Sequence, residues 1–270
     1  MDRARKFIHI RLGCALAFCV FAGTQEHLFG GSSAPTYSSA SIVQAASQTS
    51  GTLAPNDIVT IYGTNLAFST EALGAGNLIN GNLPLSLAEV SVYVNGLQAN
   101  LFYVSPGQIN FLIPYEITSS TAVVFVNRQG TDGPQVTIEL ATTAPAFFQW
   151  NGNFAVAEHA NGSLISPAAP ASAGEVIVLF AAGLGRTSPD VSSGVIIQTA
   201  VTILYASQLQ VLLNGVAVPA ANIYYAGATP GFAGLYQVNV QLPEVLPPNP
   251  QIQLVIGSQA SPAAIQLSVQ

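Results

Sequence analysis

The stretch VNGLQANLFYVSPGQINFLIP spans residues 94–114, and a looser copy, LNGVAVPAANIYYAGATPGFAGLYQVNVQLP, spans residues 213–243. Both contain an Asn-Gly pair, then two adjacent aromatic residues, then Gln-x-Asn-x-x-x-Pro. Asn-Gly between β-rich runs is a strong hairpin signal, because a type I′ turn needs positive φ at both central residues. A chain repeats such a phrase when it has duplicated either a binding site or a fold.

The sequence around the phrase favours a duplicated fold. DIVTIYGTNLA begins at Asp57 and matches EVIVLFAAGLG, which begins at Glu175, at a constant offset of 118 residues. Each copy holds six or seven short strand-like runs within about 100 residues, with turn signals between them and no helical periodicity. The sequence therefore predicts an all-β protein built from two tandem immunoglobulin-like antiparallel β-sandwiches.

Composition fits a folded β-protein. The 270 residues are 50% hydrophobic and only 7% charged. Aliphatic and aromatic residues occur in every segment after residue 50, which argues against disorder. After the N-terminus, no apolar run approaches the length of a membrane-spanning helix.

The N-terminus has the pattern of a secretory signal peptide, with basic residues, a short apolar run and small residues at its end. We expect cleavage after Ala22; an uncleaved anchor helix is the alternative. The expected organisation is a signal peptide at 1–22, a flexible leader at 23–40, a first Ig-like domain at 41–145, a linker at 146–173 and a second Ig-like domain at 174–270.

Cleavage would leave a chain with two arginines, eleven acidic residues, no lysine and no cysteine. Nucleic-acid binding needs several phosphate-facing cations, so it is excluded as a function class. Disulfides, zinc–thiolate sites and cysteine nucleophiles are excluded as well. The expected location is the cell surface or the extracellular medium, with no integral membrane span in the mature chain.

Several longer motifs resemble a known family. They are LAPNDIVTIYGTNLA, VYVNGLQANLFYVSPGQINFLIPYEI, TAPAFF, SAGEVIVLFAAGLGRTSP and AGATPGFAGLYQVNVQLPEV. Together they look like the acidobacterial Solibacter-type C-terminal domain, a family of uncharacterised function, and each half resembles an IPT/TIG immunoglobulin-like module. The resemblance covers roughly residues 41–270. It implies an extracellular Ig-like tandem in bacteria and no reaction, since the family has no established catalytic residues to carry over.

No catalytic or metal-binding pattern emerges from the residues themselves. His159 has Glu158 beside it and serines nearby, but catalysis needs partners that converge in space, so we expect a loop histidine facing water. The carboxylates are scattered singly, without calcium-loop spacing. Asp57 and Glu175 begin equivalent strands, which indicates a structural role such as holding a turn. The sequence predicts no enzyme, no cofactor and no metal site.

Two features could serve binding. The pairs Gln108/Asn110 and Gln237/Asn239 form either a polar strip for a ligand or, as we expect, amides that cap the backbone of a neighbouring loop. The second copy also carries an insertion, residues 226–235, among aromatic residues that could form a binding surface. The candidate ligand-binding residues are Trp150, Tyr224, Tyr225, Phe232 and Tyr236.

The predicted function is a non-enzymatic secreted or cell-surface module for adhesion or protein–protein interaction. Its partner would be an unknown protein or an envelope glycan. Carbohydrate or envelope-polymer binding, with Trp150, Tyr225 and Phe232 as stacking platforms, is the first alternative. A sorting or anchoring domain is the second.

Overall fold

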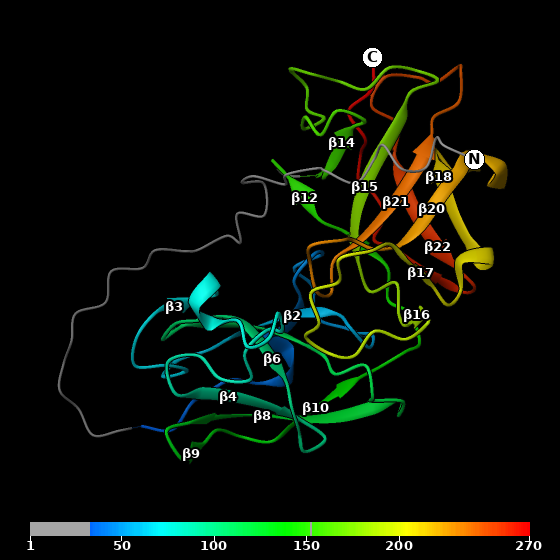
Figure 1. The fold of residues 1–270 in the computed structure, drawn as a ribbon. Helices are drawn as coiled ribbons and strands as arrows, with labels where there is room; N and C mark the ends of the chain where they lie inside the picture. The colour runs from blue at the N-terminus through cyan, green and yellow to red at the C-terminus, as the bar shows by residue number, and fades with distance from the viewer. Residues whose placement is uncertain (1–32, 152) are drawn as a thin grey trace.

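A computed structural model describes residues 33–151 and 153–270 of the protein (Figure 1). The predicted signal peptide at 1–22 lies outside the described residues. The described chain is all-β, as predicted, and forms two tandem immunoglobulin-like antiparallel sandwiches. Its helical turns are short 3-10 segments, namely η2 (Ser39–Ser41), η3 (Ala75–Asn77), η4 (Ala206–Gln208) and η5 (Ala220–Asn222). Within these ranges no helix is long and apolar enough to cross a membrane.

The first unit pairs two antiparallel sheets around one core. In spatial order, its first sheet contains β1 (Ile42–Gln44), β2 (Ile58–Tyr62), β7 (Gln108–Leu112), β6 (Asn100–Val104) and β3 (Glu71–Ala72). Its second sheet contains β10 (Val136–Glu139), β8 (Thr121–Arg128), β4 (Val90–Val94) and β5 (Leu97–Gln98), with β9 (Thr131–Asp132) paired to β8. Val, Ile and Leu from alternate positions fill the space between the sheets, as the period-two pattern requires.

The second unit repeats this plan with a larger first sheet. That sheet runs β11 (Ala146–Phe147), β15 (Val176–Ala182), β21 (Tyr236–Gln241), β20 (Ile223–Ala228), β17 (Val201–Ile203) and β16 (Thr187–Ser188), with β14 (Ala157–His159) also paired to β15. The facing sheet runs β19 (Val216–Ala217), β18 (Leu209–Leu213), β22 (Ile252–Ile256) and β23 (Gln259–Ala260). A separate hairpin consists of β12 (Gln149–Trp150) and β13 (Phe154–Ala155).

Strand register demonstrates the duplication directly. In the first unit Thr60 of β2 faces Asn110 of β7. In the second unit, Val178 of β15 faces Asn239 of β21, which is the position equivalent to Asn110. The repeated Gln-x-Asn phrase therefore occupies the same place in the same strand pair of both sandwiches, and a fold was duplicated.

The repeated aromatic pair is explained by a β-bulge. In β6 the register with β7 shifts between Leu101 and Tyr103, and in β20 the register with β21 shifts between Ile223 and Tyr225. The extra residue at each shift is the first aromatic of the pair. A bulge interrupts strict side-chain alternation and re-aims the side chain at that position.

The two Asn-Gly turns have the predicted conformation. Asn95 and Gly96 have φ of 48° and 80°, and Asn214 and Gly215 have φ of 49° and 80°. Each asparagine also accepts a backbone hydrogen bond through its side chain, from Val123 N at 2.8 Å in the first unit and from the equivalent position in the second. Asparagine therefore provides both the positive φ and a tie to the neighbouring strand.

Residues 33–40, which the sequence predicts as part of a flexible leader, are held against the first sandwich. Thr36 pairs with Thr64 through two backbone hydrogen bonds of 2.9 Å. Tyr37 is buried, and its hydroxyl donates to Pro134 O at 2.7 Å and accepts from Val126 N at 2.8 Å. Tertiary hydrogen bonds to residues about 90 positions away hold this segment on the first sandwich.

The segment expected as a linker contributes to the second unit. Its strands β11 and β14 pair with β15, and Phe147, Ala157 and Ile165 lie in the core of the second sandwich. Its composition of Ala, Pro, Gly and Asn is typical of a linker. Such small residues also suit close packing beside β15. At the other end of the segment, Ala171 pairs with Val269 near the C-terminus.

Candidate functional site

The two units meet through a third apolar cluster. Ile58 and Leu112 from the first unit pack with Phe148, Phe180 and Leu235 from the second. This contact explains why β2 and β7 are buried on both faces, whereas a sandwich by itself buries only the inner face. Gln108 and Asn110 of β7 are buried as well, so the first copy of the amide pair cannot reach a ligand in solvent.

The predicted binding insertion, residues 226–235, lies in this contact. Gly234 has φ of +72°, and a Cβ built on it would lie 2.4 Å from Leu112 Cδ1. Leu235 is 1% exposed and belongs to the inter-unit cluster. The insertion therefore serves to join the units.

The five predicted ligand-binding aromatics do not form one surface. Trp150 and Phe232 are partly buried against the inter-unit cluster. The hydroxyl of Tyr225 donates to Ala228 O at 2.7 Å and accepts from Val201 N at 3.0 Å. Burial raises the pKa of Tyr225 to about 12.

Tyr236 and Tyr224 represent the two extremes of exposure. Tyr236 is 1% exposed and donates its hydroxyl hydrogen bond to Gly185 O. This burial corrects its assignment as a ligand contact and raises its pKa. Tyr224 is 56% exposed, and its hydroxyl donates to Gln241 Oε1 at 2.6 Å. Of the five predicted residues, Tyr224 alone is more than half exposed.

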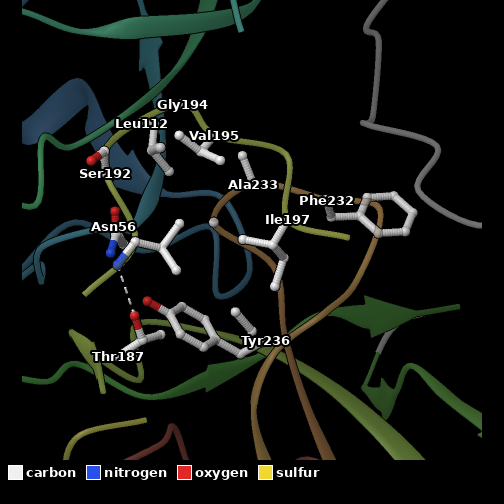
Figure 2. A pocket seen from close by; sticks show the side chains of 13 residues that line it. Asn56, Leu112, Thr187, Ser192, Gly194, Val195, Ile197, Phe232, Ala233 and Tyr236 are labelled. Carbon is white, nitrogen blue, oxygen red and sulfur yellow. Dashed lines mark hydrogen bonds between the residues drawn. The ribbon is translucent and has the colours of Figure 1, made fainter. Parts of the chain in front are cut away.

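A small cavity lies beside Tyr236 at the junction of the units (Figure 2). It is lined by Asn56, Leu112, Thr187 and Ile197 among others, and the ring of Phe232 points away from it. Its volume of about 20 Å³ is enough for a single water molecule. The cavity is a packing defect of the interface and cannot hold an organic ligand.

Asp57 and Glu175 have the predicted turn-holding role. Asp57 Oδ2 accepts from Ala54 N at 3.3 Å, and Glu175 Oε2 accepts from Ser172 N at 2.9 Å, which is the equivalent bond. Asp57 is also fully buried, with Gln44 Nε2 donating to Oδ2 at 2.8 Å. Burial raises the pKa of this carboxyl to about 7.

His159 lies on strand β14 instead of in a water-facing loop. Its Nδ1 is 2.5 Å from Glu175 Oε1, and its Nε2 is 3.2 Å from Ala169 O. A hydrolytic triad needs a hydroxyl nucleophile at the nitrogen remote from the carboxylate, and here that nitrogen faces a backbone carbonyl. The His159–Glu175 pair instead ties β14 to the turn before β15. In the described part of the chain, no cluster of three or more His, Cys, Asp or Glu side chains could hold a metal ion.

A larger hollow lies on the first unit, and we call it the first-unit groove. It has a volume of about 590 Å³. Its apolar lining consists of Ile79, Leu83, Leu85, Leu97 and Pro114. Its polar lining consists of Asn80, Asn82, Gln98, Asn100, Glu116 and Ser193.

The apolar lining is unusually accessible. Ile79, Leu85 and Leu97 are 64%, 44% and 42% exposed, and they are three of the large apolar residues exposed on the described surface. Single exposed aliphatic residues are normal, but a gathering of them in a groove is a candidate interaction surface.

Hydrogen bonds hold the groove wall, residues 79–85, in place. Leu83 N donates to Gly194 O of the second unit at 2.8 Å, and Asn100 Nδ2 donates to Leu83 O at 2.8 Å. Gln98 Nε2 donates to Leu85 O at 2.9 Å. The yellow-green segment around β16, which leads to Gly194, lies between the two units (Figure 1). Both units therefore shape the groove.

Glu116 is the charged residue of the groove lining. Ser193 Oγ donates to Glu116 Oε2 at 3.0 Å and accepts from Tyr115 N at 2.8 Å. Arg128 and Arg186 are the cationic side chains of the described chain apart from histidine. Arg128 is 2% exposed, and Arg186 is paired with Asp190. The groove therefore combines apolar contacts, amides and one carboxylate.

Sequence reasoning did not find the groove. The run LINGNLPL, residues 78–85, alternates aliphatic residues and amides, and this alternation is the feature of the sequence that points to the groove. It does not reveal that the aliphatic residues remain exposed, because exposure depends on β5 and on the second unit.

The solved structures that resemble this chain do so only distantly. No protein family and no curated protein matches the chain. One solved structure is SGBP-B from the mixed-linkage glucan utilization locus of Bacteroides ovatus, in complex with a mixed-linkage heptasaccharide. It is 10% identical to this chain with a TM-score of 0.32, and the match covers 81% of this chain and 43% of that one. The surface glycan-binding protein PbSGBP-B of Prevotella bryantii is 14% identical with a TM-score of 0.28, over 87% and 42%. Tandem Ig repeats of Dlar are 11% identical with a TM-score of 0.22, over 82% of this chain and 92% of that one. The chain spans less than half the length of the two glycan-binding proteins.

Proposed function

We propose that the protein is a non-enzymatic, secreted or surface-displayed binding module that holds an extended peptide segment of a partner protein in the first-unit groove. The observation that carries this proposal is the gathering of exposed Ile79, Leu85 and Leu97 beside four amide side chains. Aliphatic contacts with interspersed amides suit a peptide, whose side chains and main chain need both.

The groove also offers a strand edge. β5 is the outermost strand of its sheet, in the order β10-β8-β4-β5. In its hairpin Val94 faces Leu97 and Tyr93 faces Gln98. Because the pair next to a two-residue turn exchanges the hydrogen bonds, the backbone groups of Gln98 point away from β4. A peptide can add its main chain at this edge.

Charge indicates the kind of segment. Glu116 is the charged residue among those that line the groove, and Arg186, which lies over the ring of the neighbouring Tyr115, offsets only part of its charge because it is already paired with Asp190. A partner segment with one basic residue among aliphatic residues therefore complements it. Carbohydrate binding is less well supported at this site, because no aromatic ring lines the groove.

The wider setting of the module is also part of the proposal. The signal-peptide pattern of residues 1–22 supports secretion. The ordered motifs and the duplicated register support membership of the acidobacterial Solibacter-type family and its IPT/TIG-like modules. Tandem sandwiches of this kind commonly present loops and edges to partners.

Selection from a random peptide display library tests the function. Wild-type protein and Leu97→Asp are used as bait, with Val216→Asp as the matched control. Val216 is the residue after the Asn-Gly turn in the second unit, is 72% exposed and lies outside the groove. We expect wild type and Val216→Asp to enrich peptides with a basic residue among aliphatic ones, and Leu97→Asp to lose at least tenfold in binding them. Enrichment of no peptide, or equal binding by all three baits, would overturn the proposal.

A further inference from the structure

The second copy of the amide pair differs from the first in exposure. Gln108 and Asn110 are 8% and 0% exposed, whereas Gln237 and Asn239 are partly exposed. The duplicated register makes these positions equivalent, so the sandwich itself does not require either state. The surroundings of each strip, and not the sandwich itself, therefore set the difference in exposure.

The open strip has a third amide and an exposed ring. Gln241 replaces Leu112 at the end of the strand, and Tyr224 donates its hydroxyl hydrogen bond to Gln241 Oε1 at 2.6 Å. Tyr224 occupies the bulge, so its ring stands on the outer face with the amides. We call Tyr224, Gln237, Asn239 and Gln241 the second-unit strip.

The strip retains unused hydrogen-bonding capacity. Gln237 Nε2 donates to Asn239 Oδ1 at 3.0 Å. Within residues 33–151 and 153–270, the Oε1 of Gln237 and the Nδ2 of Asn239 make no hydrogen bond to another residue. An acceptor and a donor are therefore available side by side on one strand face.

A buried acceptor projects from the same face. Glu158 faces Val178, and Val178 faces Asn239, so the three share one cross-strand row. Glu158 is 4% exposed, and in the described chain its Oε2 has no hydrogen-bond partner. Buried polar atoms of a folded protein are normally satisfied, which marks this end of the strip as incomplete.

We propose that the second-unit strip binds an uncharged polysaccharide. The strip exposes amides and a tyrosine ring and has no cationic residue, which disfavours an anionic polymer. Sugar hydroxyls both donate and accept hydrogen bonds, matching the free Oε1 and Nδ2. The apolar face of a sugar ring packs on an aromatic ring. The site is separate from the first-unit groove and does not rest on the peptide-binding proposal.

Affinity gel electrophoresis in hydroxyethylcellulose, galactomannan and dextran, with alginate as the anionic comparison, tests the proposal. We expect at least one neutral polymer to retard the wild type. Tyr224→Ala and Asn239→Ala should each weaken binding about tenfold, whereas Tyr224→Phe should keep most of it. Leu204→Ala is the matched control, because Leu204 is an apolar residue of the second unit that is 49% exposed. Its retardation should equal that of the wild type.

The outcomes separate the two proposed sites. The groove variant Leu97→Asp should be retarded like the wild type, so loss of peptide binding and loss of polysaccharide binding are independent results. Retardation by no neutral polymer, retardation by alginate alone, or wild-type behaviour of Tyr224→Ala would each overturn the polysaccharide site. Circular dichroism of each variant checks that the fold is retained.

Discussion

Replacing Asp57 by asparagine should change how stability depends on pH. Asp57 is fully buried beside the inter-unit contact, and its Oδ2 accepts from Gln44 Nε2 and Ala54 N. Its Oδ1 is a buried atom without a hydrogen-bond partner in the described chain. Asparagine keeps the accepting oxygen and the shape but has no charge to bury.

The magnitude follows from the pKa of the carboxyl. Burial raises it from 3.8 to about 7 in the folded protein. Below the unfolded value both states bind the proton; between the two values only the folded state does, so stability falls as pH rises through this window. A difference of about three pKa units at 1.36 kcal/mol each gives a loss of about 4 kcal/mol between pH 4 and pH 8.

Urea unfolding of wild type and Asp57→Asn at pH 4.5, 6 and 8 measures the effect. Both proteins contain all the other titrating groups, so the contributions of those groups cancel in the difference between the two unfolding free energies. It should shift in favour of the variant by about 3–4 kcal/mol from pH 4.5 to pH 8. Glu158, whose pKa burial also raises to about 7, leaves a residual slope in both proteins.

A surface carboxylate provides the control. Glu139 is exposed at the end of β10, so Glu139→Gln should change the pH profile by less than about 0.5 kcal/mol. If the difference between wild type and Asp57→Asn stays constant within about 1 kcal/mol across the three pH values, Asp57 is not a buried carboxyl that ionises near neutrality, and the reasoning fails.

Two further predictions concern the segments that join distant parts of the chain. Tyr37→Phe leaves Val126 N and Pro134 O without their partner and should lower the unfolding free energy by about 1–3 kcal/mol; Tyr224→Phe, at an exposed hydroxyl, should cost less than about 1 kcal/mol in the same urea titration. Gly234→Ala places a Cβ 2.4 Å from Leu112 Cδ1 and should loosen the inter-unit contact by about 1–3 kcal/mol beyond Gly231→Ala, where φ is also positive but no atom lies within 4 Å of the added Cβ. Equal melting temperatures for the two alanine variants would contradict this account of the insertion.

Local features of the fold could be predicted because they depend on neighbouring residues. The Asn-Gly turns need positive φ, and alternation of apolar and polar residues orients each strand. Asp57 and Glu175 were assigned to turns from their equivalent positions, and both accept a hydrogen bond from the residue three positions before them. The bulge was not recognised, although the repeated aromatic pair was its signal.

The candidate sites required contacts between distant segments. Tyr236 and Tyr224 look alike in sequence, yet one is buried at the unit junction and the other is exposed at a bulge. The first-unit groove depends on residues 79–85 being held by Gly194 from the second unit. No local pattern carries that information, because it arises from packing between segments more than 100 residues apart.

The sequence by itself determined the two sandwiches and their Asn-Gly turns, since turn chemistry and a period of two act over a few residues. Tertiary structure alone decided which faces remain open. Gln108 and Asn110 are buried, whereas Gln237 and Asn239 are partly exposed, although the two pairs have the same spacing. Burial depends on which surface packs on another, and two identical local patterns can therefore have different exposures and different functions.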